Sequence, residues 1–286
     1  MSTGVDKVSV VIPAKNESVG LAKILPKLVL IEEVFEVIVV DDGSSDNTVE
    51  LCAEHGVKCI SHPESMGNGA SIKTGARAAI GDVLVFMDGD GQHQPEEITS
   101  LLNKLESGYD LVVGSRDASG QASLGRRLAN GFYNWFASWM SSREIHDLTS
   151  GFRAVRADKF REFLYMLPNG FSYPTTSTMA FLRSGYSVGF KPINVLQRDG
   201  KSHINLVRDG VKFFLIIFKI ATLYSPLKLF SLVSFGLLTT GMSYYLYTYF
   251  SVGRFTNMGM FLLVSAILVF LMGLLSEQVS TLFYKK

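Results

Sequence analysis

The sequence predicts an α/β protein in which helices cover both faces of a mostly parallel sheet, followed by interfacial helices and a two-helix transmembrane hairpin. Apolar strand-like runs alternate with helical patterns over residues 1–205. Two of these runs end directly in acidic motifs, and residues 206–286 are dominated by Leu, Phe, Ile, Val, Tyr and Ser. Alternating strands and helices indicate a parallel sheet, and long apolar segments indicate membrane spans.

The strand-like runs are short and are separated by helices with recognisable ends. The runs lie at 8–12, 35–40, 57–60 and 83–87. One helix is expected over Thr48–His55, after the caps Ser44, Ser45 and Asp46, and Gly56 closes it. Another opens at Pro95 and ends near Gly108. Strands with helical crossovers of this length give a parallel sheet whose connections are right-handed.

In open α/β sheets, ligands bind beyond the carboxyl ends of the strands. The loops at Pro13–Glu17, Asp41–Ser44 and Asp88–Gln92 follow three of the expected strands. Asp88 and Asp90 come directly after the run Val83–Met87, one residue apart. Two carboxylates there make an oxygen site for Mg²⁺, which takes one or two carboxylates and completes its shell with substrate phosphates.

Composition excludes some classes of function. The chain has 27 basic and 26 acidic side chains, so no global field favours nucleic acid as a partner. Cys52 and Cys59 are unclustered and are expected to be reduced, buried thiols. The first residues lack the apolar stretch of a signal peptide, so we expect the α/β part to stay in the cytoplasm.

Residues 123–142 are expected to form an amphipathic helix. Its apolar stripe consists of Leu128, Phe132, Trp135, Phe136 and Trp139. The pattern alone leaves two alternatives open: a helix that packs in the core, or one that lies at a membrane interface, where Trp is favoured.

Residues 206–227 are expected to form an amphipathic helix on the membrane surface. Arg208, Lys212 and Lys219 fall within about 40° of one another on an ideal helix, while nearly everything else there is apolar. A narrow basic stripe on an apolar helix suits anionic headgroups. A buried core helix remains the alternative.

Residues 228–286 are expected to cross the membrane twice, at about 228–250 and 258–283. The first segment is roughly 34 Å long as a helix, enough for the hydrocarbon core. Lys219, Lys228, Lys285 and Lys286 flank one side and Arg254 the other, so both termini are expected on the cytoplasmic side of a cytoplasmic (inner) membrane. Soluble core helices are the alternative, since Ser, Thr and Tyr dilute the first segment.

Four motifs stand in a fixed order: Ile12-Pro13-Ala14-Lys15-Asn16-Glu17, Val39-Val40-Asp41-Asp42-Gly43-Ser44, Asp88-Gly89-Asp90-Gly91-Gln92-His93 and Gly114-Ser115-Arg116. Their order and spacing resemble the family 2 glycosyltransferases with a GT-A fold, which is Rossmann-like. Together with Asp147-Leu148-Thr149-Ser150-Gly151-Phe152-Arg153, they are most similar to dolichyl-phosphate mannose synthases and bacterial polyprenyl-phosphate glycosyltransferases. The resemblance covers about residues 7–203 by motif, and the hairpin by architecture.

The resemblance implies roles for individual residues. The nucleotide-sugar would be bound by Pro13, Lys15, Glu17, Val40, Asp42, Asp88, Gly89 and Asp90. A metal cofactor, Mg²⁺ or Mn²⁺, would be held by Asp88, Asp90 and Gln92. Catalytic roles would fall to Asp88, Asp90, Arg116 and Asp147, and the acceptor phosphate would meet Arg116, Arg126, Arg127, Arg198 and Lys201. Each residue type alone is also common in helix starts, Asx-turns and surface ion pairs.

The sequence departs from the family pattern at two places. The family has an Arg followed by Gly-x-Ser-Lys near the end of its catalytic domain. Here 198–203 is one residue shorter, with His203 at the position of the lysine, which leaves the roles of Arg198 and Lys201 open. Segment 171–178 lacks the acidic residue that related enzymes often carry there.

The resemblance implies inverting transfer of a hexose from a nucleotide-sugar, GDP-mannose or a UDP-sugar, to undecaprenyl or dolichyl phosphate. The product would be a β-linked polyprenyl-phosphate sugar. Two alternatives stay open: a membrane glycosyltransferase with another lipid or glycan acceptor, and a non-catalytic transferase-like membrane subunit. The aromatic first span leaves surface for self-association, so a homo-oligomer is also open.

Overall fold

The computed structural model describes residues 7–116, 124–170, 172–195, 215, 218–219, 221–222 and 224–284. Most of the expected surface helix, including Arg208 and Lys212, lies outside these residues, as do Arg198, Lys201 and His203. Lys219 is described and is half-buried in a helical turn before the hairpin.

A seven-stranded sheet forms the centre of the domain, in the order β3-β2-β1-β4-β6-β5-β7. Adjacent strands in the sheet run parallel to each other, except that β6 is antiparallel to both β4 and β5. The strands are β1 Val8–Ala14, β2 Val34–Asp41, β3 Lys58–Ser61, β4 Val83–Phe86, β5 Leu111–Arg116, β6 Arg153–Arg156 and β7 Val188–Ile193. The predicted α/β class with a mostly parallel sheet is confirmed.

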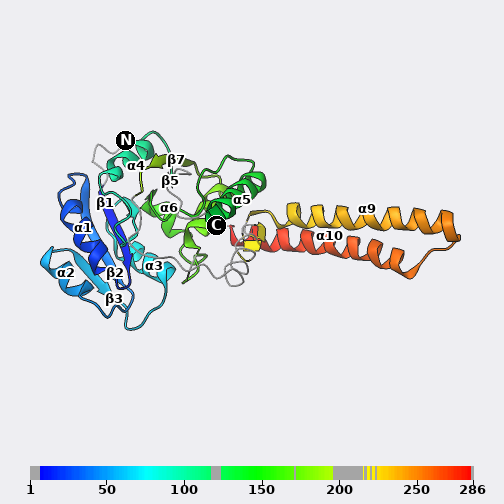
Figure 1. The fold of residues 1–286 in the computed structure, drawn as a ribbon. Helices are drawn as coiled ribbons and strands as arrows, with labels where there is room; N and C mark the ends of the chain where they lie inside the picture. Colours follow the sequence, from blue (N-terminus) through cyan, green and yellow to red (C-terminus); the bar gives the residue numbers. More distant parts are fainter. Residues whose placement is uncertain are drawn as a thin grey trace.

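Helices cover both faces of this sheet (Figure 1). They are α1 Ser18–Leu28, α2 Thr48–Glu54, α3 Asn68–Ala78, α4 Glu97–Glu106, α5 Leu124–Ser141, α6 Ala157–Arg161 and α7 Tyr173–Arg183. The side chains of β1 alternate between the two layers: Val10 and Ile12 pack with α1 and α4, while Val11 packs with α3 and α6. This alternation is the period of a strand that is buried on both faces.

Parallel pairing brings the ends of β1, β2 and β4 to one edge of the sheet. Ala14 pairs with Asp41, and the next residue, Asp42, donates its N–H to the Ala14 carbonyl at 2.8 Å. Met87, just before the acidic motif, donates to the Val11 carbonyl at 3.2 Å. The three loops expected to bind ligand therefore lie side by side.

Helix α5 buries a face that overlaps only in part with the predicted aromatic stripe. Tyr133, Phe136, Ala137 and Met140 are buried, in a cluster that includes Met179 of α7. Phe132 and Trp135 stay exposed, at 41% and 60%. Phe136 of the predicted stripe belongs to this cluster and Trp139 packs against it, so the buried face shares only part of the stripe. The helix therefore packs in the core along one face, and whether its exposed aromatic residues meet a membrane interface stays a prediction.

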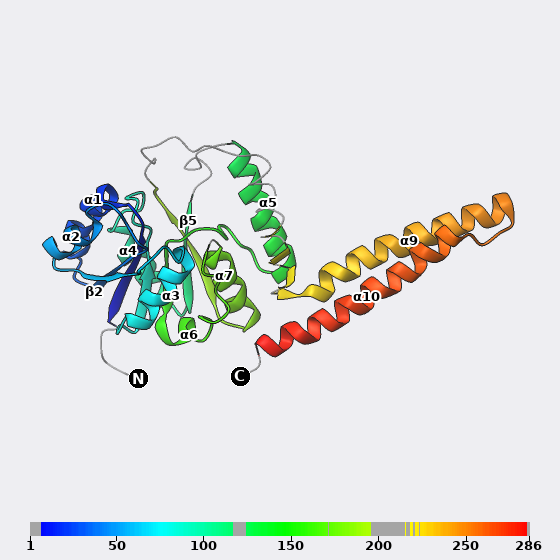
Figure 2. The same cartoon turned by 90° about the horizontal axis from the view of Figure 1, so that it is seen from below.

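Two long helices form a hairpin that projects away from the α/β domain (Figures 1 and 2). They are α9 Pro226–Val252 and α10 Asn257–Phe283, each within two residues of the expected bounds. Gly253, at φ 67°, ends α9, and the Thr256 side chain accepts a hydrogen bond from Gly259 N–H at the start of α10. Both helices are long and apolar enough to cross a membrane, and little of either is buried within the protein.

Candidate active site

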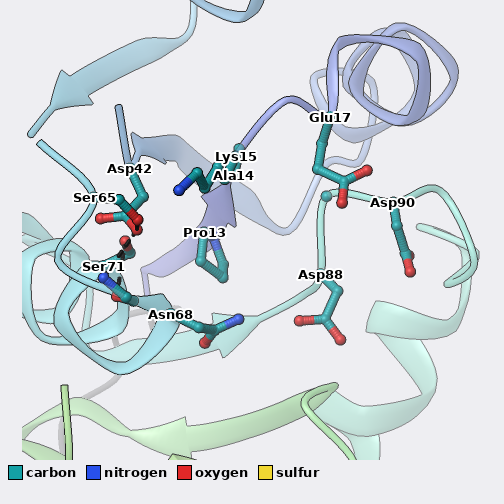
Figure 3. A pocket seen from close by; sticks show the side chains of 12 residues that line it. Pro13, Ala14, Lys15, Glu17, Asp42, Ser65, Asn68, Ser71, Asp88 and Asp90 are labelled. Atoms are coloured by element: carbon teal, nitrogen blue, oxygen red, sulfur yellow. Dashed lines mark hydrogen bonds between the residues drawn. The ribbon is translucent and has the colours of Figure 1, made fainter. Parts of the chain in front are cut away.

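The loops at the carboxyl edge of the sheet enclose a cavity of about 420 Å³. Asp42, Ser65 and Ser71 lie on one side of it, and Glu17, Asp88 and Asp90 lie on the other (Figure 3). The full lining is Pro13, Ala14, Lys15, Glu17, Asp42, Ser65, Gly67, Asn68, Ser71, Asp88, Gly89 and Asp90. All residues predicted to bind the nucleotide-sugar line this cavity except Val40. That residue is fully buried in the core layer against α3, where its side chain packs and does not reach the cavity.

Asp42 is held by a dense set of hydrogen bonds. Its carboxylate accepts from His62 Nδ1 at 2.8 Å, Ser65 Oγ at 2.7 Å, and the N–H groups of Met66 and Gly67 at 2.8 and 2.9 Å. Burial opposes ionisation, but these bonds outweigh it and lower the pKa of Asp42 to about 2. Asp42 therefore lines the cavity and also fixes the 62–67 segment that forms one of its walls.

The start of α3 contributes cavity residues that sequence reasoning did not single out: Ser65, Gly67, Asn68 and Ser71, besides Ala14 of β1. Gly67 has φ 99° and comes just before the helix. A Cβ on Gly69 would lie 2.0 Å from the Pro168 carbonyl oxygen, so only glycine fits. The available signal was Gly67-Asn68-Gly69, a small-residue turn between a strand and a helix.

Asp88 and Asp90 bring two carboxylates to the cavity in a tightly packed loop. A Cβ on Gly20 of α1 would lie 2.2 Å from the Gly89 carbonyl oxygen, which shows how closely α1 supports this loop. His93 Nε2 lies 3.8 Å from Asp88 Oδ2, and the His93 ring stacks on Phe152 at 4.9 Å. Burial opposes ionisation of Asp88, but His93, Arg116 and Arg153 outweigh it, so its pKa is lowered.

The donor set at this loop suits a hard divalent cation. Two carboxylates from one strand end are a common protein contribution to a Mg²⁺ site, with the remaining positions left for phosphate and water. No cluster of three His, Cys, Asp or Glu side chains is placed for metal binding among the described residues. Gln92 does not line the cavity, and its backbone N–H donates to Asp90 Oδ1 at 3.1 Å. Its role as a metal ligand stays a prediction.

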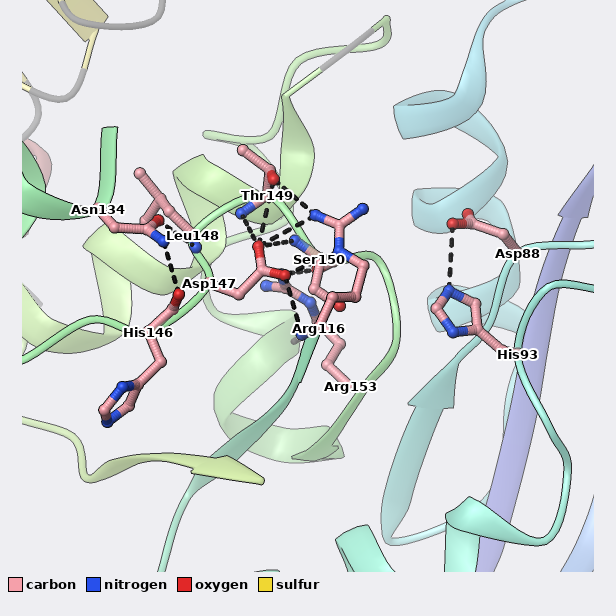
Figure 4. Close-up of polar contacts among 10 residues, drawn as sticks. All are labelled: Asp88, His93, Arg116, Asn134, His146, Asp147, Leu148, Thr149, Ser150 and Arg153. Atoms are coloured by element: carbon pink, nitrogen blue, oxygen red, sulfur yellow. Dashed lines mark hydrogen bonds and ion pairs between the residues drawn. The ribbon is translucent and has the colours of Figure 1, made fainter. Parts of the chain in front are cut away.

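Arg116 and Asp147 form a bidentate ion pair at the end of β5 (Figure 4). Arg116 Nε donates to Asp147 Oδ2 at 2.8 Å, and Nη2 donates to Oδ1 at 3.1 Å and to Thr149 Oγ1 at 2.8 Å. Burial opposes both charges, but the pairing outweighs it, lowering the pKa of Asp147 and raising that of Arg116. Asp147 also accepts the N–H groups of Thr149 and Ser150, so it organises its own turn as well as Arg116.

The loop that carries Asp147 passes directly beside Asp88. A Cβ on Gly151 would lie 2.9 Å from Asp88 Oδ2, so a larger residue would crowd that carboxylate. The Tyr173 hydroxyl donates to the Gly151 carbonyl at 3.0 Å and holds the loop in place. The ion pair and the acidic cavity edge therefore belong to one site, although Arg116 does not itself line the cavity.

Arg153 is fully buried beneath this loop, a feature that the motif alone did not predict. Its Nη1 donates to the Pro174 carbonyl, Ser177 Oγ and Thr178 Oγ1 at 2.8–3.2 Å, and its Nη2 donates to the Ser150 carbonyl. Burial lowers the pKa of Arg153, while the fields of Tyr173, Asp147 and Asp88 oppose this. Segment 171–178, noted for lacking an acid, thus supplies neutral oxygens to a buried guanidinium.

The structure does not describe the side chains of four predicted acceptor residues. Arg126 and Arg127 lie in the first turn of α5, but their side chains are outside the described residues, and so are Arg198 and Lys201.

Cys52 is buried and Cys59 is half-buried, and neither forms a disulfide.

The family model for glycosyl transferase family 2 matches residues 9–164, which contain β1 to β6 and every cavity residue. The chain belongs to glycosyl transferase family 2. A second model, the GtrB C-terminal hairpin, matches residues 225–282, the two long helices. The resemblance read from the four motifs is confirmed, and the chain is a glycosyltransferase.

Curated relatives extend over most of the chain. Glycosyltransferase AglJ of Haloferax volcanii is 29% identical over 248 residues, covering 85% of this chain and 81% of that protein. An undecaprenyl-phosphate 4-deoxy-4-formamido-L-arabinose transferase of Yersinia pestis is 29% identical over 251 residues, covering 84% of this chain and 75% of that protein.

Solved structures share the fold of the α/β domain. Glucosyl-3-phosphoglycerate synthase from Mycobacterium tuberculosis, in complex with Mn²⁺, UDP and glucosyl-3-phosphoglycerate, matches with a TM-score of 0.61 at 21% identity. The match covers 76% of this chain and 79% of that one. The same enzyme with Mg²⁺ and UDP matches with a TM-score of 0.58. The GT-A fold is thereby confirmed.

Proposed function

We propose that this glycosyltransferase moves a hexose from a nucleotide-sugar, GDP-mannose or a UDP-sugar, to a membrane-bound polyprenyl phosphate. The transfer would depend on Mg²⁺ or Mn²⁺ and invert the anomeric centre, giving a β-linked polyprenyl-phosphate sugar. The reaction would take place at the cytoplasmic face of the membrane, with the hairpin spanning it and both termini in the cytoplasm.

The observation that carries this proposal is the position of the Arg116–Asp147 ion pair beside Asp88. The cavity offers carboxylates on one side, suited to a metal and the diphosphate of the donor. Beyond the Gly151 loop, outside this cavity, the Arg116 guanidinium is held rigidly by Asp147 and is suited to a second anion. Two anionic substrates repel each other, and a fixed arginine between them offsets that repulsion.

A phosphate acceptor also explains why the site needs no dedicated base. The second pKa of a phosphate monoester is near 6, so its oxygen is already anionic at neutral pH. The protein then has to align that oxygen behind the anomeric carbon and stabilise the departing nucleoside diphosphate. When bound, a divalent cation at Asp88 and Asp90 would neutralise charge on the leaving phosphate.

The hairpin and the named relatives support a lipid acceptor. Large apolar side chains on both long helices are exposed, among them Phe235 at 64%, Phe261 at 66% and Leu275 at 69%. Such surfaces are stable in the hydrocarbon core of a bilayer. The Yersinia relative is named for transfer to undecaprenyl phosphate, although its sugar is one particular modified arabinose.

The test is transfer of radiolabel from a panel of GDP- and UDP-sugars to undecaprenyl phosphate by the purified protein in detergent, with Mn²⁺ present. We expect one donor to give metal-dependent label in the organic phase. Asp90→Asn should reduce that label by about two orders of magnitude, because the cation loses one of its two carboxylates. Asp82→Asn is a matched control, since Asp82 lies just before the other end of β4 and its carboxylate accepts Lys7 N–H at 3.1 Å, away from the cavity.

Absence of label from every donor, with active controls, would overturn the proposed acceptor. An unchanged rate for Asp90→Asn would remove the metal assignment while leaving the acceptor intact. Label that appears on another lipid or on a glycan would establish the alternative transferase.

A further inference from the structure

Asn134 of α5 forms hydrogen bonds with the peptide groups on both sides of Asp147 (Figure 4). Its Nδ2 donates to the His146 carbonyl, and its Oδ1 accepts the Leu148 N–H at 3.0 Å. The backbone entering and leaving Asp147 is therefore fixed by one amide side chain. Rotation of either peptide plane would turn the Asp147 carboxylate away from Arg116.

Asp147 has no freedom of its own to compensate such a rotation. It is 3% exposed, and both carboxylate oxygens are used by Arg116, Thr149 and Ser150. A bidentate arginine–carboxylate pair requires the two planes to be aligned. The direction in which the guanidinium faces is thus set by Asp147, and the direction of Asp147 is set by the loop that Asn134 holds.

Helix α5 is itself anchored at its far end to the base of the hairpin. The Lys228 ammonium of α9 donates to the Trp139 carbonyl and lies over the Trp139 ring at 4.7 Å, and the Tyr224 hydroxyl donates to the Ser141 carbonyl at 3.1 Å. The last carbonyls of a helix lack intrahelical partners, and a cation there is also favoured by the helix dipole. These contacts make α5 a fixed support between the hairpin and the Asp147 loop.

We propose that Asn134 is a positioning residue, which acts through Asp147 to aim the Arg116 guanidinium at the acceptor phosphate. The identity of that acceptor rests on the proposed function, while the link from Asn134 to Arg116 does not. Asn134 does not line the donor cavity. Its loss therefore affects the acceptor and leaves donor and metal binding unchanged.

The kinetic test compares Asn134→Ala with Ser138→Ala. Ser138 lies one turn further along α5 and bonds the same loop, accepting Ile145 N–H at 3.0 Å, but it does not flank Asp147. We expect Asn134→Ala to raise KM for polyprenyl phosphate about tenfold, the factor that ~1.4 kcal/mol represents, with KM for the donor unchanged. Ser138→Ala should leave both constants within about twofold, since ordinary substitutions away from such a contact have small effects.

A double-mutant cycle separates positioning from general damage. Arg116→Lys already loses the bidentate geometry, so adding Asn134→Ala to it should raise KM for the acceptor little further. Full additivity of the two changes would overturn the proposal. Equal effects on donor and acceptor KM, or equal effects of Asn134→Ala and Ser138→Ala, would overturn it as well.

A measurement without substrate keeps this inference distinct from the proposed function. Nitrogen-15 NMR of the arginine side chains in detergent, with the Arg116 Nε–H assigned through Arg116→Lys, reports hydrogen exchange at the bond to Asp147. We expect Asn134→Ala to speed that exchange at least about tenfold and Ser138→Ala to leave it unchanged. If transfer to polyprenyl phosphate fails but this exchange result holds, the proposed acceptor is wrong and the positioning role of Asn134 stands. Unchanged exchange in Asn134→Ala would overturn the positioning role whatever the acceptor.

Discussion

At the scale of single residues, the buried carboxylates of this site have a different role from the more exposed ones. Asp42 and Asp147 are each 3–4% exposed and accept several hydrogen bonds from protein donors, whereas the side chain of Asp88 is 39% exposed. Asp42 lines the cavity together with Asp88 and Asp90, but it also holds the 62–67 segment in place, as Asp147 holds its own turn and Arg116. Such a division is expected where a site must be rigid before its substrates arrive.

The sequence could predict the cavity carboxylates but not the buried roles. Asp88 and Asp90 follow an apolar strand, and that local pattern suffices to place them at the edge of the sheet. The partners of Asp42 lie 20–25 residues away in the chain, and the burial of Arg153 depends on a helix 21–25 residues further on. Contacts across such separations depend on how elements pack, which local pattern does not encode.

Asp42→Asn should destabilise the protein at neutral pH and much less in acid. The native pKa of Asp42, about 2, lies below the ordinary aspartate value of 3.8, and this difference contributes roughly 2 kcal/mol of stability. Because the native pKa is depressed, that contribution is fully present above pH ~4 and is lost as the pH falls toward 2. Thermal unfolding of wild type and variant in detergent should show a gap at pH 7 that closes near pH 2. A gap that stays constant with pH would contradict the charge-based account.

At the scale of elements, the start of α3 is fixed by the loop that precedes α7. Gly69 and Ala70 donate their N–H groups to the Gly170 and Asn169 carbonyls at 3.2 and 2.8 Å. The helix therefore begins where that loop allows, and Asn68 and Ser71 reach the cavity from it. Asn68 and Ser71 were not predicted to bind the nucleotide-sugar, because Asn and Ser are common in all kinds of segment. Only the position of the start of α3 brings them to the cavity.

Gly69→Ala should destabilise the protein by about 1–3 kcal/mol, because the added methyl overlaps the Pro168 carbonyl and the helix start must shift. The shift should also weaken donor binding, measurable by calorimetry with UDP or GDP. Gly131→Ala on α5 is the matched control, since a Cβ there meets nothing within 4 Å. It should keep or raise stability through better helix propensity. Equal stability of the two variants would show that α3 is not held as described.

Helix α5 marks the limit of prediction from hydrophobic pattern. The pattern predicted the helix within one residue at each end, but only Phe136 and Trp139 of its aromatic stripe contact the core cluster. Aromatic residues at 132 and 135 are exposed, and Tyr133, Ala137 and Met140 are buried instead. The buried face of a helix depends on its neighbour, and Met179 of α7 belongs to a segment far along the chain.

At the scale of the whole molecule, one acidic residue joins the hairpin to the α/β domain. Glu277 of α10 accepts from Arg183 Nη2 at 2.6 Å, from Ser225 Oγ at 3.2 Å and from Leu227 N–H at 3.2 Å. It therefore pairs with the end of α7 and also satisfies a free N–H at the start of α9. The spans were predicted from length and composition, but the role of Glu277 at this junction, beside the contacts of Lys228 and Tyr224 with α5, depends on how the helices pack.

Glu277→Gln should lower the free energy of unfolding by about 2 kcal/mol, since a charged hydrogen-bond acceptor is lost and Arg183 is left without its carboxylate. Thermal unfolding in detergent measures this change. Glu96→Gln is the control, because the Lys27–Glu96 pair is more than half exposed on both sides. That variant should unfold at the same temperature as the wild type. If both variants behaved alike, Glu277 would be no more than a surface charge.

The proposed acceptor is a lipid phosphate, which needs no base from the protein. The most direct measurement is a paired assay of sugar transfer to polyprenyl phosphate and to the matching polyprenol, which lacks the phosphate. We expect metal-dependent transfer to the phosphate and none to the alcohol, because Arg116 would bind the anion and only the anion is already nucleophilic. Transfer to the alcohol, or transfer to neither lipid while another acceptor is glycosylated, would contradict it.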